Sequence, residues 1–330
     1  MSAVRLPRIE KILSGFKRRN ILVVGDLMLD KFIWGEVSRI SPEAPIPVVE
    51  VESVSNMPGG AANVVNNICA LGGKGHVCGV VGKDADGREL IRLLKDKGAD
   101  VRATITSSSV QTIVKTRVIA RHQHVVRIDQ EHSIDANGGI KRRLLDLIRE
   151  KIPDIDAVVL EDYGKGVLND NLVREVVRLA EGKSVIVTAD PKIDHELDFS
   201  GIGVLTPNSN EAYHFAGMSP KKGEKVEDVG RALRRKWGGI SVVITLGDKG
   251  MCLFERNRKP RYIRTEAKEI FDVAGAGDTV IASLTMALAS GADLQEAAVI
   301  ANIAAGIVVQ KSGVETASCG EIIEAARSEL

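Results

Sequence analysis

Short runs of β-branched and other apolar residues alternate along the chain with amphipathic segments of helical spacing. Strands that alternate with helices in this way predict a mostly parallel sheet that is covered on both faces. We therefore expect an α/β fold built around one such sheet. The runs that predict its strands lie at residues 21–24, 76–81, 157–160, 184–188, 202–205 and 241–245.

Two stretches, residues 31–54 and 110–129, break this alternation. The first contains Pro42, Pro45 and Pro47, and proline confines a strand to a sheet edge or makes it irregular. The second alternates apolar and polar side chains. Together they predict a small β-sheet lid over the site, whose apolar face needs a cover that a second subunit would supply. We expect a single domain, 1–330, with this lid as an appendage.

Composition and charge narrow the class of protein. The net formal charge is +1 and only 3% of the residues are aromatic, so neither a basic face nor base-stacking platforms for nucleic acid are expected. The four cysteines lack metal-ligand spacing and indicate reduced thiols. The sequence shows no signal-peptide pattern and no apolar run long enough to span a bilayer, so we expect a cytoplasmic protein without a membrane partner.

Polar residues and glycines follow directly after the predicted strands. In mostly parallel sheets, ligands bind at the carboxyl ends of the strands. The residues in such positions are therefore candidates for one common site. They are Asp26, Asp30, Glu161, Asp162, Asp190, Asn208 and Gly247.

Residues 271–279 place two glycines and a carboxylate at the start of a predicted helix. The amides of a first helical turn can hold an anion, and Gly275 and Gly277 let the backbone approach it closely. A carboxylate at this positive end, Asp278, suits a base that takes the proton of a substrate hydroxyl. The alternative is an ordinary glycine-rich turn in which Asp278 caps the helix.

A second glycine pair, Gly59 and Gly60, precedes Asn63 and another apolar helix. The glycines admit a close approach of the backbone, and Asn63 can reach the hydroxyls of a polyol from the first helical turn. Together with Asp30 they predict a clamp for sugar hydroxyls. The alternative is a helix start with a buried asparagine.

Three further motifs suit the phosphates and the metal of a nucleotide. Asn208 and Glu211 share a helix face and can order the waters of a hydrated Mg²⁺, although a capping box explains the same residues. Lys192 lies just beyond a predicted strand, where it suits phosphates or is a surface lysine. Residues 245–250 predict a strand-to-strand turn that could also border a nucleotide.

The second lid stretch concentrates positive charge. Such a run is usually a solvated strand face. If the lid closes over a substrate, Arg117 and Arg121 are our candidates for holding an anionic group. His122 and His124 have no cysteine or carboxylate at ligand spacing, so we expect no tightly bound metal.

The two glycine motifs, residues 59–63 and 272–278, resemble those of the ribokinase or PfkB family of carbohydrate kinases. The resemblance runs from Gly25 to about Val309. Residues 39–49 and 162–166 resemble the D-glycero-β-D-manno-heptose 7-phosphate kinases, the kinase half of the bifunctional bacterial heptose enzymes. The resemblance implies a three-layer α/β/α sandwich with a β lid that often builds a dimer.

The resemblance also implies a role for each matching residue. Two positions depart from the family pattern: Ala274 stands in place of a threonine, and Glu161 replaces a smaller polar residue and could alter substrate contacts. The implied roles are the catalytic base (Asp278), the anion hole (Gly275, Ala276, Gly277), the sugar site (Asp30, Gly59, Gly60, Asn63), the sugar phosphate (Arg117), ATP (Lys192, Asn208, Thr245, Gly247, Gly250) and water-mediated Mg²⁺ (Glu211).

We therefore expect Mg·ATP-dependent phosphorylation of the anomeric O1 of a heptose 7-phosphate, giving the 1,7-bisphosphate for the ADP-heptose of lipopolysaccharide. Because the sequence ends at Leu330, we expect a separate nucleotidyltransferase to act downstream. A kinase for another sugar or sugar phosphate, such as fructose 6-phosphate, tagatose 6-phosphate or ribose, is an alternative. A non-catalytic sugar or nucleotide sensor is another.

Overall fold

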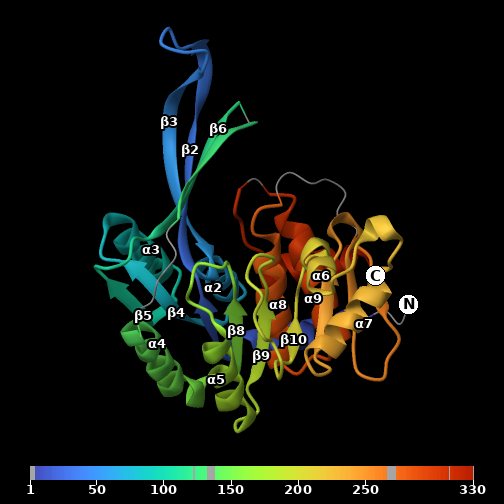
Figure 1. The fold of residues 1–330 in the computed structure, drawn as a ribbon. Coiled ribbons are helices and arrows are strands. Elements are labelled where there is room, and N and C mark those ends of the chain that lie inside the picture. The colour runs from blue at the N-terminus through green and yellow to red at the C-terminus, as the bar shows by residue number, and fades with distance from the viewer. Residues whose placement is uncertain (1–3, 122, 132–137, 266–272, 312, 330) are drawn as a thin grey trace.

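The computed structural model describes residues 4–121, 123–131, 138–265, 273–311 and 313–329. It contains two β-sheets, a larger one within the body and a smaller one that projects from it (Figure 1). The strands of the larger sheet are β1 (Asn20–Gly25), β4 (Lys74–Gly82), β5 (Asp100–Ser107), β8 (Ala157–Glu161), β9 (Ile186–Asp190), β10 (Val204–Leu205), β11 (Ser241–Thr245), β12 (Met251–Phe254) and β13 (Arg261–Ile263).

This nine-stranded sheet has the order β13-β12-β11-β10-β9-β8-β1-β4-β5. Its strands are parallel except at the β11–β12 and β12–β13 pairs, which are antiparallel. The prediction of a mostly parallel sheet is confirmed. The run at 184–188 begins later than predicted, at Ile186, and only Val204–Leu205 of the run at 202–205 forms a strand. The pattern did not predict β5, β12 or β13, and β12 and β13 are too short for a periodicity to identify them.

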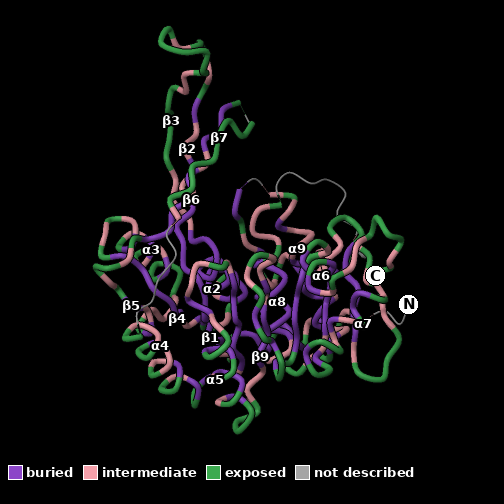
Figure 2. The backbone as a smooth tube through the Cα atoms, viewed as in Figure 1, coloured by how far each residue is buried: buried purple, intermediate pink, exposed green. Residues whose placement is uncertain are grey.

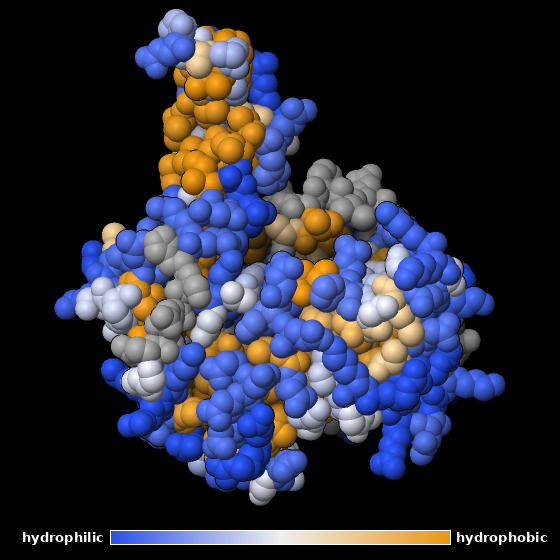
Figure 3. All heavy atoms as spheres, in the orientation of Figure 1, coloured by the Kyte–Doolittle hydropathy of each residue, from blue (hydrophilic) through white to orange (hydrophobic). Residues whose placement is uncertain are grey.

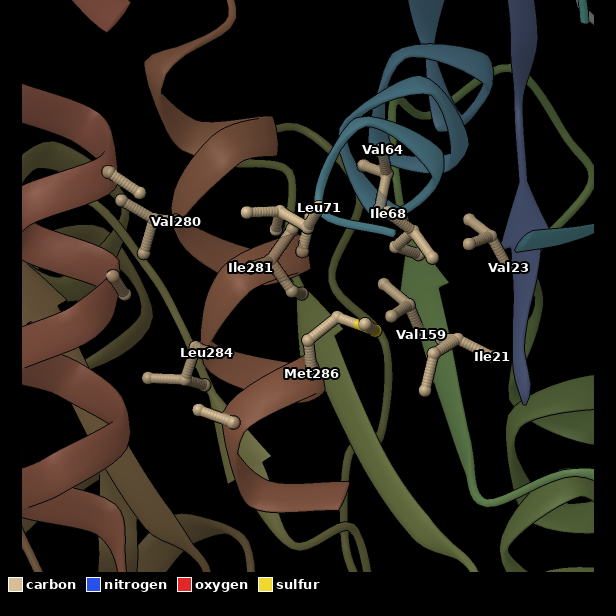
Figure 4. Packing of buried hydrophobic residues seen from close by; sticks show 14 of the residues in the cluster. Ile21, Val23, Val64, Ile68, Leu71, Val159, Val280, Ile281, Leu284 and Met286 are labelled. Atoms are coloured by element: carbon tan, nitrogen blue, oxygen red, sulfur yellow. The ribbon is translucent and has the colours of Figure 1, made fainter. Parts of the chain in front are cut away.

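Helices cover both faces of the sheet, so the molecule has three layers (Figure 1). Along β1, Ile21 and Val23 belong to one hydrophobic core and Leu22 and Val24 to the other, because successive strand side chains point to opposite faces. Figure 4 shows the first core, and Figure 2 shows that the buried residues follow the sheet. None of the described helices has the length and apolar character needed to cross a membrane.

The helices divide between the two layers according to the core in which their side chains are buried. The first core takes α1 (Leu6–Gly15), α2 (Ala61–Ala70), α3 (Ala85–Asp96), α8 (Ala276–Ala289), α9 (Leu294–Val308) and α10 (Cys319–Glu329). The second takes α4 (Gly138–Lys151), α5 (Asp170–Glu181), α6 (Ser209–Phe215) and α7 (Val226–Lys236).

The smaller sheet forms the projecting lid. Its strands are β2 (Leu27–Ile40), β3 (Pro47–Gly60), β6 (Ile113–Ala120) and β7 (Gln123–Gln130). The order is β3-β2-β6-β7, so β3, which begins at Pro47, is an edge strand. In contrast, β2 is an interior strand, with register shifts against β3 after Trp34 and Val37. The prolines of the first stretch lie outside β2, which explains how β2 can pair on both sides.

One face of the lid exposes a broad group of apolar side chains (Figure 3). Val51 and Ile128 keep 58% and 51% of their surface exposed. Eight apolar residues line a shallow depression on the lid, with a volume of about 490 Å³. A patch of this kind on a single chain indicates an interaction surface.

Candidate active site

Three adjoining cavities lie at the carboxyl ends of the central strands. The first has a volume of about 380 Å³, and the second and third each have about 190 Å³. Asp278 lines both the first and the second, whereas Gly277 and Thr245 line both the second and the third. The cavities therefore form a continuous row, and Asp278 lies where the first two meet.

The row is organised by the start of α8. Its N-cap, Gly275, has φ 78° and carries no side-chain cap. A Cβ at Gly275 would lie 2.9 Å from Asn63 Nδ2, so a larger residue is excluded by both conformation and space. The Ala276 N–H donates to the Val273 carbonyl at 3.2 Å, while Gly277 faces the second and third cavities. Asp272, which begins the motif, lies outside the described residues.

Asp278 is held in the first turn of α8 by donors from two distant segments. Asn63 Nδ2 donates to Oδ2 at 2.7 Å, and the Tyr163 hydroxyl donates to Oδ1 at 3.0 Å. Burial raises the pKa of Asp278 to about 6, although both donors lower it. Its side chain does not cap the helix, so the alternative of a capping aspartate is wrong. A carboxylate with this pKa is ionised at neutral pH and suited to accept a proton.

The predicted sugar clamp is assembled around the first cavity. Asp30, Gly60 and Asn63 line it, and a Cβ at Gly59 would lie 2.7 Å from Asp30 Oδ2. Asn63 is indeed a buried asparagine near a helix start, as the alternative proposed. Its side-chain N–H₂ group, however, holds Asp278, which the sequence did not reveal.

Five cations line the first cavity, namely Lys115, Arg117, Arg127, Lys165 and Lys192. Lys115 and Lys165 both pair with Glu131, and Arg117 donates to Asp30 Oδ1 at 2.5 Å. Arg121, by contrast, is exposed between β6 and β7 and is absent from the residues that line the cavity. Of the two arginines predicted to hold an anion, the structure thus brings only Arg117 to the cavity. His122 lies outside the described residues.

The second cavity is lined by carboxylates and by Asn208 and Lys192. Asn208 Oδ1 accepts the Glu211 N–H at 3.0 Å, and Glu211 Oε2 accepts the Asn208 N–H at 2.9 Å. The capping box is therefore confirmed, although both residues also line the cavity. Carboxylate and amide oxygens suit Mg²⁺. In the described ranges, no group of three or more His, Cys, Asp or Glu side chains is arranged to hold a metal by itself.

The third cavity lies beside the turn between β11 and β12, where a turn was predicted. Thr245, Gly247 and Gly250 line it, together with apolar residues of α8 and α9. Gly250 has φ 85°, and a Cβ there would lie 2.0 Å from the Ile263 carbonyl oxygen. Its apolar walls suit a flat ring such as a purine base.

Glu161 is fully buried at the end of β8. Neither carboxylate oxygen has a hydrogen-bond partner among the described residues. Burial, followed by the charges of Asp190 and Asp278, raises the pKa of Glu161 well above its ordinary value. It is absent from the residues that line these three cavities, so its effect on substrate contacts stays a prediction.

Sequence reasoning missed several residues that line the cavities. Tyr163 and Lys165 belong to the segment after β8 that carried the resemblance, and this position was the available signal. Lys115 belongs to the positive run of the lid, but the sequence does not say which members face the cavity. On β6, Lys115 and Arg117 are two residues apart and therefore share a face.

Comparisons with known proteins agree with this geometry. The pfkB family carbohydrate kinase profile matches residues 18–319. Bifunctional protein HldE of Pelobacter propionicus is 40% identical over 317 residues, which are 96% of this chain and 65% of that protein. Bifunctional protein HldE of Paramagnetospirillum magneticum is 42% identical over 98% of this chain and 65% of its own length. The chain thus spans about 65% of the length of these relatives.

Solved structures support the fold. Arabidopsis thaliana ribokinase complexed with ribose and ATP matches with a TM-score of 0.71 and 20% identity, over 94% of this chain and 99% of that chain. Escherichia coli phosphofructokinase-2 in complex with substrates and products matches with a TM-score of 0.74 and 20% identity, over the same shares. With the profile match across residues 18–319, the chain belongs to the pfkB family of carbohydrate kinases.

Proposed function

We propose that this kinase transfers the γ-phosphoryl group of Mg·ATP to the anomeric O1 of D-glycero-β-D-manno-heptose 7-phosphate. The product is the 1,7-bisphosphate for the ADP-heptose of lipopolysaccharide, with a nucleotidyltransferase acting further downstream. The observation that carries the kinase chemistry is the place of Asp278, at the junction of a cation-lined cavity and a carboxylate-lined one. We place this reaction in the cytoplasm.

Different residues of the chain have different roles in the phosphoryl transfer. Asp278 accepts the proton of the sugar hydroxyl as that hydroxyl attacks the γ-phosphoryl group. The start of α8, from Gly275 to Gly277, presents its positive end to the charge that develops on the phosphoryl oxygens. Lys192, which lines both the first and the second cavity, adds a cation beside them.

The second and third cavities suit ATP. The apolar third cavity takes the purine base, and Thr245, Gly247 and Gly250 border it. Asn208 and Glu211 provide oxygen donors in the second cavity, where the phosphates would lie. Mg²⁺ bound there through water would neutralise phosphate charge.

The cations that line the first cavity favour a sugar substrate that already carries a phosphate. Arg117, Lys115 and Lys165 are already paired with carboxylates of the chain, and a phosphate can exchange with such partners. The choice of a heptose rests on the resemblance of residues 39–49 and 162–166 and on the identity with the HldE proteins. Fructose 6-phosphate and tagatose 6-phosphate offer a phosphate to the same cations, and a kinase for one of them is the second candidate.

The test is ADP release with Mg·ATP across heptose 7-phosphate, hexose 6-phosphates and free sugars. We expect turnover on the heptose phosphate alone, with Asp278→Asn as the inactive control. Arg117→Met should raise KM for the phosphosugar, whereas Arg121→Met, in the exposed turn after the same strand, should leave it near the wild-type value. Turnover on another sugar would overturn the heptose assignment, and no turnover on any acceptor would favour a sensor.

We also propose that the apolar face of the lid packs against a second copy of the chain. Val51→Asp would place a charge in that interface, and we expect it to shift the protein from dimer to monomer in sedimentation experiments. Glu52→Gln, at the neighbouring exposed position of β3, is the matched control. A wild-type protein that sediments as a monomer would contradict the proposal.

A further inference from the structure

Tyr163 lies at the same junction as Asp278, because it also lines both the first and the second cavity. Its hydroxyl donates to Asp278 Oδ1 at 3.0 Å. We propose that Tyr163 is a positioning residue, whose hydroxyl orients the Asp278 carboxylate toward the acceptor hydroxyl. The inference rests on the proposed role of Asp278 as the base.

The two carboxylate oxygens of Asp278 have separate donors. Asn63, on α2, donates to Oδ2, and Tyr163, after β8, donates to Oδ1. A carboxylate held at one oxygen can still rotate, whereas one held at both has a fixed plane. Since each oxygen can accept more than one hydrogen bond, a lone pair remains for the proton of the substrate.

The segment that carries Tyr163 is itself held in place. The fully buried Asp26 carboxylate accepts the backbone N–H groups of Tyr163 at 3.1 Å, Lys165 at 2.9 Å and Val167 at 3.1 Å. The Lys192 ammonium lies 5.8 Å from the centroid of the Tyr163 ring, over its face. A cation over an aromatic ring is attracted to it. The Tyr163 side chain therefore contacts both Lys192, which we place beside the phosphates, and Asp278, the proposed base.

Charged groups around Asp278 explain why a donor is needed there. Asp30 of β2 repels its negative charge, and Glu161 at the end of β8 and Asp190 at the end of β9 are further acidic groups that interact electrostatically with it. Of the cations that line the first cavity, Arg117 donates instead to Asp30, and Lys192 lies over the Tyr163 ring. The Tyr163 hydrogen bond therefore offsets part of the cost of ionising a buried carboxyl.

Tyr163 is also suited to remain a donor. Burial, followed by the charges of Asp278, Glu161 and Asp190, raises the pKa of Tyr163 well above its ordinary value. The hydroxyl consequently keeps its proton throughout the working range of the enzyme. Tyr163 can orient the base without exchanging a proton with it.

The test compares Tyr163→Phe with wild type in the pH dependence of kcat/KM from pH 5 to 9. The acidic limb of the wild type should lie near pH 6, at the pKa of Asp278. Loss of the Tyr163 donor should move this limb upward by about one pH unit. The variant should therefore be about tenfold slower than wild type at pH 5, with the difference shrinking toward pH 8. We expect KM for the sugar to change less than kcat.

Tyr213→Phe is the matched control, because the Tyr213 hydroxyl donates to the Glu224 carbonyl at 2.9 Å, outside the three cavities. Its limb should coincide with that of wild type. An unmoved limb in Tyr163→Phe, or equal shifts in both variants, would overturn the inference. If instead Asp278→Asn keeps near-normal turnover, the proposed base itself is wrong. The result for Asp278→Asn therefore distinguishes a failure of the base assignment from a failure of the inference about Tyr163.

A second measurement does not depend on whether Tyr163→Phe folds. The chain has three tyrosines, and 3-fluorotyrosine can replace all of them during expression. Fluorine makes the phenol a stronger donor, so the acidic limb should move to lower pH. Repeating the replacement in Tyr213→Phe and in Tyr262→Phe should preserve that shift. A limb that stays in place or rises would contradict the role of Tyr163.

Discussion

The starts of α8 and α6 are built alike and line the same second cavity, yet they use their carboxylates differently. With Gly275 and Asn208 as the N-caps, Asp278 and Glu211 both occupy the third helical position. Glu211 folds back onto the backbone N–H of its own N-cap at 2.9 Å. Asp278 instead accepts hydrogen bonds from side chains of other segments.

The N-cap accounts for much of this difference. Asn208 offers a side-chain oxygen to the first turn, and the reciprocal bond from Glu211 completes a capping box. Gly275 has no side chain, so the start of α8 is left for a ligand. The same carboxylate position therefore serves helix stability in α6 and chemistry in α8.

The largest expected effect is that of Asp278→Asn. Because a positioned base contributes roughly 10²–10⁴ in rate, we expect kcat to fall by at least about a hundredfold. The fold should persist, since the asparagine removes a buried charge and keeps the shape. Turnover and thermal unfolding measured side by side would check both points. If Asp278→Asn keeps near-normal turnover, Asp278 is not the base, and its role no longer differs from that of Glu211 in the way described.

Gly275→Ala should disturb the geometry at the start of α8 and the hydrogen bond between Asn63 and Asp278. The alanine Cβ would lie 2.9 Å from Asn63 Nδ2 and would push that side chain away from Asp278. The control is Gly291→Ala, beyond the other end of α8, which has φ 83° but nothing within 4 Å of its Cβ. Both variants should lose roughly 1–3 kcal/mol of stability through left-handed strain.

Only Gly275→Ala should also lose turnover, by at least about tenfold, because a misplaced catalytic group is costly in rate. Steady-state kinetics on both purified variants would show the difference. Equal losses of activity in the two would mean that strain, rather than contact with Asn63, governs the site.

Glu161 interacts electrostatically with both carboxylates of the comparison, Asp278 and Glu211, and its raised pKa makes the free energy of unfolding depend on pH. Above its ordinary pKa, near 4.5, the unfolded chain releases this proton while the folded chain keeps it. The free energy of unfolding should therefore fall as pH rises, by up to about 1.4 kcal/mol per pH unit. Glu161→Gln should remove the Glu161 contribution, so that the slope becomes shallower and the variant is more stable than wild type at neutral pH.

Urea denaturation between pH 5 and 8 would measure these slopes. Glu324→Gln, on an exposed position of α10, is the control and should follow the wild type. If Glu161→Gln keeps the wild-type slope, the buried carboxyl is not protonated in the folded state.

The smallest expected effect is that of Asn208→Ala, which removes one half of the capping box. Loss of an N-cap side chain costs about 1 kcal/mol. Asp293→Ala is a matched control, because Asp293 and Glu296 form the same capping box at the start of α9. We expect equal losses of stability, with a raised KM for ATP in Asn208→Ala alone. An unchanged KM would remove Asn208 from the proposed ATP site.

Local patterns predicted a large part of the molecule. The alternation of apolar runs and helical segments predicted the parallel sheet, because the period of side-chain burial is set by the local backbone geometry. The Gly275–Asp278 motif predicted the helix start and the carboxylate for the same reason. At α6 the capping box is confirmed, and because its two residues also line the second cavity, their magnesium role stays a prediction.

Contacts between distant segments escaped prediction. Asn63 and Asp278 are 215 positions apart, and Tyr163 and Asp278 are 115 apart. Arg117 and Arg121 looked equivalent in the sequence, yet only Arg117 points into the first cavity. Strand register and the turn between β6 and β7 decide this, and neither is a local property of composition.

The sequence by itself thus determined the class of fold, the helices that begin after a glycine and the identity of the carboxylate where the first two cavities meet. These depend on backbone preferences that act over a few residues. Only the tertiary structure decided that Asp278 is the carboxylate left for chemistry and which side chains hold it. The tertiary structure also raises the pKa of Asp278 to about 6. Those properties depend on burial and on donors that the fold brings to Asp278 from two distant segments.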